Sequence, residues 1–226
     1  MEALLADPIT QPFFAYGTGT MNAAINLDHR LVFYPCRGET IENFVAIHPV
    51  AQSRGAREDW QAAGCSTLDD LLAAFSDAHP SIQAMMKKAE DIKLWPLLFR
   101  KPLKTWYKGR CVLIGDAAHP MLPYQGQGGA QGLEDGAALA VMLSQLQSFD
   151  EIPRRLELFE KVRIKRASAI QIFSSVGQEQ GERMIKDAQP YVDGPVPKNP
   201  AEFRQWNFKY DVVKESLAVL REHISA

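Results

Sequence analysis

Residues 115–140 read GDAAHPMLPYQGQGGAQGLEDGAALA, and this stretch decides which local fold we expect. It contains six glycines, one histidine and three acids, and it has no lysine or arginine. The wholly apolar run Cys111–Ile114 precedes it, which is typical of a strand buried on both faces of a parallel sheet. A helix from about Gly129 to Leu146 is predicted to follow. Strand, glycine-rich loop and helix in this order predict a ligand site at the carboxyl edge of a sheet.

Two features of the loop favour a ligand, and each has a simpler alternative. Asp116 follows the predicted strand directly, so its carboxylate either accepts hydrogen bonds from ligand hydroxyls or only caps the next turn. Gly126, Gly128 and Gly129 stand just before the predicted helix, where unpaired N–H groups favour a flat or anionic group. The alternative for these glycines is a flexible turn.

Two common phosphate-binding loops do not fit the stretch. A P-loop needs a lysine and a serine or threonine after its glycines, and neither is present. The dinucleotide fingerprint GxGxxG needs a third glycine where Gln131 stands, and it must follow the strand directly. The loop is therefore not expected to bind a pyrophosphate.

Several charged residues, His119 and two methionines are interpreted as structural and not as parts of a ligand site. Glu134 and Asp135 are interpreted as stabilisers of the helix start, and His119 as a structural residue. The charge run of residues 154–166 is interpreted as a solvated helix face. Met85 and Met86 are expected in the core.

The rest of the chain predicts a mixed α/β (α+β) fold. Segments 13–25, 30–36 and 41–48 are predicted strands of an antiparallel sheet, the last two joined by the hairpin-like RGET. Helices are predicted from Ser66, with Asp69 at its third position, and from Pro80 or Ser81 to Met86. The remaining predicted elements are an edge or bulged strand at 92–99, a long helix from Asp150 with Pro153 in its first turn, and a last helix at 212–223.

Composition excludes several classes of partner. The net charge of the 226 residues is −2 and the pI is about 6.2, which argues against nucleic acid and anionic membranes. No run of 18 apolar residues occurs, and the first ten residues lack the pattern of a signal peptide. Three cysteines without CxxC spacing predict buried thiols and a cytoplasmic protein. The histidines show no metal-ligand spacing, so no metal site is expected.

The stretch CVLIGDAAHPMLPYQGQGGAQGLEDGAALA resembles the second flavin-contacting motif of the FAD-dependent aromatic hydroxylases. The similarity is strongest to the salicylate-hydroxylase-like single-component flavoprotein monooxygenases. It continues in RLVFYPCRGETIENFVAIHP, which resembles their substrate-domain hairpin, and in WYKGR before the strand. The resemblance covers nearly the whole chain and implies FAD as cofactor, NAD(P)H as electron donor and an aromatic substrate.

The resemblance also implies site residues. Asp116 would accept hydrogen bonds from the ribityl chain of FAD, Gly115 would belong to the same cofactor site, and Pro123 would lie beside the isoalloxazine ring. The backbone of Gly126, Gln127, Gly128, Gly129 and Ala130 would run past the pyrimidine edge of the ring. Tyr34, in the hairpin, would face flavin and substrate as the catalytic residue, with a packed strand aromatic as the alternative.

Domain organisation follows from the same resemblance. Residues 1–105 are expected to bind substrate, 106–150 to contact FAD, and 151–226 to form a helical region. The family's N-terminal pyrophosphate turn is missing, so the chain is expected to be a fragment, a truncated member or one half of a split enzyme. Its protein partner would be a complementing N-terminal half or a second copy in a homodimer. A non-catalytic small-molecule binder and a cofactor-free enzyme remain as alternatives.

Overall fold

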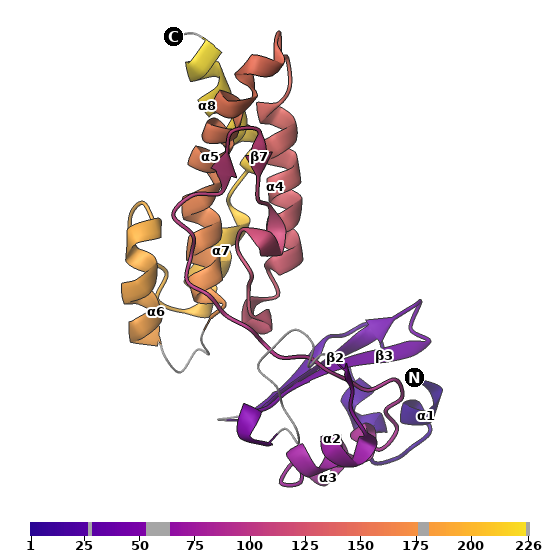
Figure 1. The fold of residues 1–226 in the computed structure, drawn as a ribbon. Helices are drawn as coiled ribbons and strands as arrows, with labels where there is room; N and C mark the ends of the chain where they lie inside the picture. Colours follow the sequence, from indigo (N-terminus) through magenta and orange to yellow (C-terminus); the bar gives the residue numbers. More distant parts are fainter. Residues whose placement is uncertain (27–28, 53–63, 176–180, 225–226) are drawn as a thin grey trace. The chain divides into compact units, whose positions relative to one another are not determined.

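The computed structural model describes residues 1–26, 29–52, 64–175 and 181–224. The chain divides into two compact parts, Met1–Pro96 (the N-terminal unit) and Leu97–Ala226 (the C-terminal unit). The fold mixes helices with antiparallel sheets, and the long helices belong to the C-terminal unit (Figure 1). The division falls at Pro96. The segments 106–150 and 151–226 thus share one unit.

The N-terminal unit is built on a three-stranded antiparallel sheet in the order β1-β2-β3. Leu31 and Phe33 of β2 alternate onto one face of the sheet and are buried there. The same apolar cluster contains Phe75, Met85 and Met86, so two short helices close this core. The elements are α1 (Glu2–Leu5), η1 (Gln11–Phe14), β1 (Asn22–Ile25), β2 (Arg30–Cys36), β3 (Ile41–Ile47), η2 (Val50–Gln52), β4 (Gly64–Cys65), α2 (Leu68–Ala74), α3 (Pro80–Met86) and β5 (Lys93–Leu94).

The sequence predicted this sheet better than the segments around it. The hairpin is confirmed, since Cys36 pairs with Ile41 across the RGET turn, and the burial of Met85 and Met86 is confirmed as well. The predicted strand 13–25 is too long, because η1 takes up its start and only β1 is extended. The predicted strand 92–99 shrinks to β5, since Pro96 has no N–H to donate to a sheet.

Helix α2 begins one residue later than predicted. Its N-cap is Thr67, and the side chain of Asp70 completes a capping box there. The prediction assigned the N-cap to Ser66 and the third helical position to Asp69, each one residue earlier than in the structure.

The C-terminal unit is a helical layer in which α4 packs against both α5 and α8 (Figure 1). Its main core joins Trp106, Met142 and Phe159. A second cluster holds the end of α5 against α6 and α7 through Phe173 and Trp206. The elements are β6 (Tyr107–Lys108), β7 (Cys111–Val112), η4 (Gly115–Ala117), η5 (Pro123–Gln125), α4 (Gly128–Met142), η6 (Phe149–Glu151), α5 (Ile152–Phe173), α6 (Gly181–Ala188), η8 (Gln189–Tyr191), α7 (Pro200–Phe208) and α8 (Val212–Ile224).

The prediction of a doubly buried parallel strand at 111–114 is wrong for this chain. Only Cys111 and Val112 form a strand, and it pairs antiparallel with β6. The next two residues, Leu113 and Ile114, are exposed. Cys111 is exposed as well, against the expectation of buried thiols. An apolar run predicts burial, but the described residues leave Leu113 and Ile114 uncovered.

The helices are close to their predictions, with two additions. Helix α4 ends four residues before the predicted end, and α5 carries Pro153 in its first turn as expected. The predicted long helix continued to residue 180, but 176–180 lie outside the described residues. Helices α6 and α7 lie on either side of the proline-rich residues 190–199 and were not predicted.

Candidate functional site

The glycine loop, residues 115–130, begins with a carboxylate that is free to bind a ligand. Asp116 lies in η4 and its side chain is exposed. Within the described residues, no hydrogen bond reaches its carboxylate, so it does not cap the turn that follows. The strand preceding it is short and exposed, yet Asp116 still presents an acceptor for ligand hydroxyls.

The other end of the loop presents donors on bare backbone. The turn η5 starts at Pro123, which is exposed, and ends at Gly126 with a φ of 61°, a left-handed conformation that favours glycine. Helix α4 then begins at Gly128, and Gln127 at its N-cap makes no side-chain capping bond. The first-turn N–H groups, up to that of Ala130, therefore lack a side-chain acceptor.

The space beside Gly128 and Gly129 is open where a side chain would project. A β-carbon added at Gly128 or Gly129 would meet no atom within 4 Å. Nothing in the described residues therefore requires glycine for packing at these two positions. The donor set fits a flavin, whose ring edge offers acceptors and gains negative charge on reduction, and the Asp116 acceptor fits ribityl hydroxyls.

A buried charge cluster lies directly behind the loop. Asp135 of α4 accepts hydrogen bonds from Gly115 N at 2.9 Å and from His119 Nε2 at 2.7 Å. Its other oxygen accepts from Arg163 Nε of α5 at 2.8 Å, and all three side chains are nearly fully buried. Burial alone raises the pKa of Asp135. The hydrogen bond from His119 and the charge of Arg163 outweigh burial, so the pKa lies below its usual value.

A second buried pair continues the cluster. Glu134 accepts from Arg163 Nη1 at 2.5 Å and from Arg166 Nε at 2.7 Å. Burial raises the pKa of Glu134, but the hydrogen bond and charge of Arg166, together with the charge of Arg163, lower it below its usual value. Arg166 also stacks on the ring of Tyr210, 4.0 Å from its centroid.

Sequence reasoning missed this cluster. Glu134 and Asp135, interpreted from the sequence as stabilisers of the helix start, lie in the second turn of α4 and pair with arginines of α5. The solvated-face interpretation of the charge run is wrong for Arg155, Arg163 and Arg166, which are buried. The structural interpretation of His119 is confirmed by its burial and its bond to Asp135.

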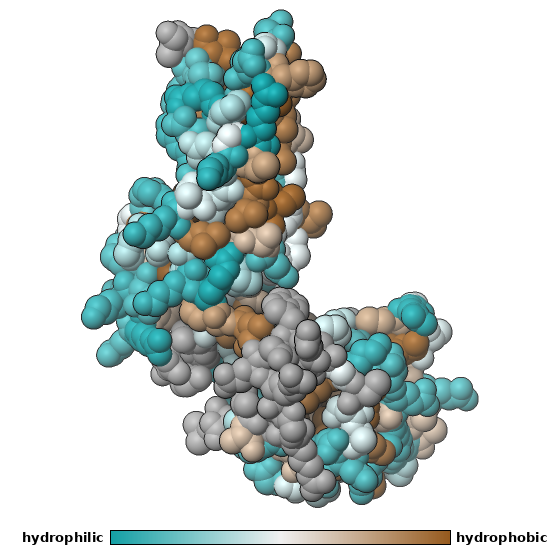
Figure 2. Space-filling model, viewed as in Figure 1, coloured by the Kyte–Doolittle hydropathy of each residue, from teal (hydrophilic) through white to brown (hydrophobic). Residues whose placement is uncertain are grey.

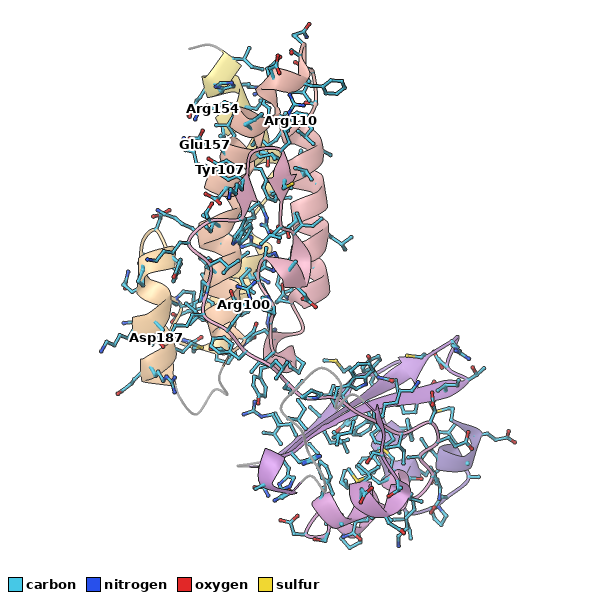
Figure 3. All side chains as sticks on the ribbon, in the orientation of Figure 1. Arg100, Tyr107, Arg110, Arg154, Glu157 and Asp187 are labelled. Carbon is cyan, nitrogen blue, oxygen red and sulfur yellow. The ribbon has the colours of Figure 1, made fainter. Side chains whose placement is uncertain are left out.

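The carbonyl groups of the loop are held by a third set of contacts. Arg100, labelled in Figure 3, donates through Nη2 to the carbonyl oxygens of Ala117 and Ala118, at 2.7 and 2.9 Å. Gln171 of α5 in turn donates to the carbonyl oxygen of Arg100 at 2.8 Å. The first half of the loop is thus fixed on both its N–H and its carbonyl sides.

Tyr34, the predicted catalytic residue, belongs to the N-terminal unit. It lies in β2 opposite Asn43 and is half-buried. Strand alternation puts it on the face opposite Phe33, away from the core of that unit. Its proposed function next to the flavin stays a prediction.

The described residues contain neither a candidate metal site nor a candidate membrane span. In the ranges given above, no group of three or more His, Cys, Asp or Glu side chains could hold a metal ion. No helix in those ranges combines the length and the apolar character needed to cross a membrane.

Comparison of the chain with known proteins identifies its family. The model of the FAD binding domain family FAD_binding_3 matches residues 15–174. The chain is 37% identical over 226 residues to the FAD-dependent monooxygenase cfoG of Aspergillus candidus, covering 98% of this chain and 51% of that protein. It is 34% identical over 144 residues to 6-hydroxynicotinate 3-monooxygenase of Bordetella bronchiseptica, covering 64% and 37%.

A solved structure agrees with the sequence matches. The structure titled salicylate hydroxylase substrate complex superposes with a TM-score of 0.69 at 26% identity, covering 93% of this chain and 53% of that one. The chain spans about half the length of the curated relatives that it matches over nearly its whole extent. The match to the family model over most of its length shows that the chain belongs to the FAD binding domain family of the FAD-dependent monooxygenases.

Proposed function

We propose that the glycine loop holds the ribityl chain and the flavin ring of FAD in a monooxygenase that hydroxylates a small aromatic molecule. One observation carries the proposal. A single loop has an unpaired, exposed carboxylate at Asp116 and an uncapped helix start on bare backbone at Gly128. The first group suits the hydroxyls of a ribityl chain, and the second suits the electron-rich edge of a flat ring.

The residues of the chain then have distinct tasks. The Asp116 carboxylate accepts hydrogen bonds from the ribityl chain, next to the backbone of Gly115. The first-turn N–H groups of α4 and the positive end of its dipole stabilise negative charge at the pyrimidine edge. Pro123 covers the ring. When bound, FAD supplies the redox chemistry, with NAD(P)H as donor and O₂ as oxidant.

The substrate class is supported by names among the relatives. Salicylate and 6-hydroxynicotinate, named for two of the matched proteins, are aromatic rings that carry an acid and a hydroxyl group. A substrate of this class would meet the β1-β2-β3 sheet, where Tyr34 has a phenol that can orient a ring hydroxyl.

A protein partner is supported by the outer face of α4. Gly129, Leu133, Gly136 and Ala140 recur at helical spacing and are all exposed, and none of them is polar. Brown and white residues are prominent along the α4 edge of the C-terminal unit in Figure 2. This face suits burial against another polypeptide, and the exposed Leu113 and Ile114 add apolar surface to the same unit. We propose that the partner is the complementing half of the FAD domain.

The test is a complementation assay. The chain is titrated with FAD alone and after coexpression with the N-terminal half of the Aspergillus candidus relative. We expect weak binding alone, and a yellow complex with NAD(P)H oxidation after complementation. Leu133→Glu should prevent the complex while leaving the fold of the isolated chain intact, because Leu133 is 79% exposed.

Two controls separate the alternatives. Glu222→Gln changes a residue of α8 and should leave the complex intact. A chain that dimerises by itself through the same face, with Leu133→Glu breaking the dimer, would identify a second copy as the partner. Failure to bind FAD in both arms would remove the flavin proposal and favour a cofactor-free or non-catalytic binder.

A further inference from the structure

The glycine loop is fastened at both of its ends to side chains outside it. At the first end, Asp135 Oδ2 accepts from the backbone N–H of Gly115 and from the ring of His119. At the second end, Asn207 Nδ2 of α7 donates to Gln127 Oε1 at 2.9 Å. Both fastening points lie within two residues of groups that are proposed to contact the flavin.

The two ends are joined by a continuous path of buried charged groups. Arg163 links Asp135 to Glu134, with Nε on the first carboxylate and Nη1 on the second. Arg166 links Glu134 to Asn207, whose Oδ1 accepts from its Nη2 at 3.0 Å. The path therefore runs from Gly115 to Gln127 through two carboxylates and two guanidinium groups.

The charges on this path balance within a buried space. Two arginines face two carboxylates, and the most exposed member, Glu134, is only 20% exposed. A carboxylate only accepts hydrogen bonds, so His119 donates from Nε2 and adds no charge when it is neutral. Such a network is rigid when every member is paired, because any unpaired charge would be costly there.

Two of the three hydrogen bonds that Asp135 accepts come from the glycine loop. One of its oxygens accepts from Arg163, which holds the carboxylate in place. The other accepts from Gly115, the residue before Asp116, and from His119, three residues after Asp116. Simple pairing of α4 with α5 would not require these last two bonds.

We propose that Asp135 is a positioning residue of the flavin site, which sets the backbone of residues 115–119 so that Asp116 points outward to the ribityl chain. Arg163 holds Asp135, and the Arg166–Asn207 branch sets Gln127 at the start of α4. This inference rests on the proposed function of the loop. Asp135 itself does not touch the cofactor.

Helix α5 offers a matched control. Arg155 is also buried and donates to Glu151 Oε2 at 2.9 Å and to the carbonyl oxygen of Met142. Neither of these partners belongs to the glycine loop. Arg155→Met therefore removes a buried arginine from the same helix without changing the loop.

The experiment compares Asp135→Asn with Arg155→Met in the complemented protein. Asp135→Asn keeps the shape but offers one acceptor where three donors converge. We expect its FAD dissociation constant to rise about tenfold or more, and amide exchange at Gly115 to accelerate. Arg155→Met should lower the unfolding midpoint with both quantities as in wild type. Equal FAD affinity and Gly115 exchange in wild type and Asp135→Asn would overturn the proposal.

A second pair of variants covers the case in which Asp135→Asn does not fold. His119→Leu removes one donor but leaves Asp135 paired with Arg163, whereas His119→Gln supplies an amide N–H in its place. We expect His119→Leu to weaken FAD binding and His119→Gln to restore it. Unchanged binding in His119→Leu would contradict the positioning role. If wild type binds no FAD, the proposed function fails, and Gly115 exchange in these variants still tests the role of Asp135 in the loop.

Discussion

Helix α4 has two faces whose polarity is the reverse of that of an ordinary surface helix. Its inward face carries Gln131 and Asp135, which are fully buried, before it becomes apolar at Ala138 and Met142. Its outward face carries Gly129, Leu133, Gly136 and Ala140, which are exposed. Amphipathic helices usually bury their apolar side and expose their charges.

The difference between the faces shows that burial follows the partner of a side chain more than its type. Asp135 is buried and Glu134 is largely buried because α5 places Arg163 and Arg166 within ion-pair distance of them. The outward face is exposed because no described element of this chain packs against it. Each face can be tested separately by substitutions that should change the stability of the chain, its affinity for FAD or its binding of the partner, one at a time.

The largest effect is expected on the inward face. Arg163→Met removes the only guanidinium bonded to Asp135 among the described residues, and breaking a buried ion pair costs about 3–5 kcal/mol of stability. Urea unfolding followed by circular dichroism measures the change. Arg154→Met is the matched control on the same helix, since its pair with Glu157 is half-exposed and should contribute less than about 1 kcal/mol (Figure 3). Equal losses in the two variants would show that the inward cluster has no special energetic weight.

The next effect concerns the outward side of the loop. Gly128→Val places a branched side chain where the ring edge is proposed to lie, so FAD affinity should fall by about a hundredfold or more, or about 2.7 kcal/mol. The structure sharpens this prediction: among the described residues, a β-carbon there meets no atom within 4 Å outside its own helix. Stability should therefore change by less than about 0.5 kcal/mol. A melting temperature and an FAD titration on the same variant test both parts. A stability loss with intact affinity would make the loop a simple turn.

A smaller effect is expected at the start of the loop. Asp116→Ala removes a charged acceptor, which typically costs about 1.5–3 kcal/mol, or about tenfold to a hundredfold in FAD affinity. Its stability should match wild type, because Asp116 is exposed and no protein group donates to it in the described residues. Isothermal titration with FAD gives the comparison. Equal dissociation constants would exclude Asp116 from the site.

The smallest effect distinguishes the isolated chain from its complex. Gly136→Ala should stabilise α4 by about 1 kcal/mol, because the new methyl group meets no described atom outside its own helix and alanine favours the helix. In the complemented protein the same methyl group would enter the proposed interface. We expect the gain in thermal stability to disappear there. A gain that persists unchanged would argue against docking on this face.

The sequence predicted the parts of the fold that depend on local signals. The RGET hairpin, the proline in the first turn of α5 and the glycine loop before α4 were all found, because each depends on neighbouring residues. The apolar run 111–114 was mistaken for a doubly buried strand, since hydrophobicity indicates that a segment can be covered but does not indicate what covers it.

The burial of the charged cluster could have been predicted from a different pattern in the sequence, the spacing of the arginines in α5. Arg155, Arg163 and Arg166 fall on the same helical face as Phe159 and Ile170, at spacings of three and four residues. Arginines in register with buried aromatic and aliphatic residues indicate a buried ionic face. The identity of their acidic partners could not follow from the sequence of α5, because the pairing with α4 is tertiary.

The uncapped start of α4 makes the helix depend on what binds to it. Gln127 stands where serine, threonine, aspartate or asparagine normally caps a helix, a contribution of about 1 kcal/mol that this chain does not make for itself. In the proposed site, FAD would accept hydrogen bonds from the first turn and so supply the missing cap. Occupancy and folding are then linked by mass action: at a hundred times the dissociation constant, bound FAD adds about 2.7 kcal/mol to stability. The concentration of FAD in the cell would thus help to set how much of this protein survives heat and proteolysis.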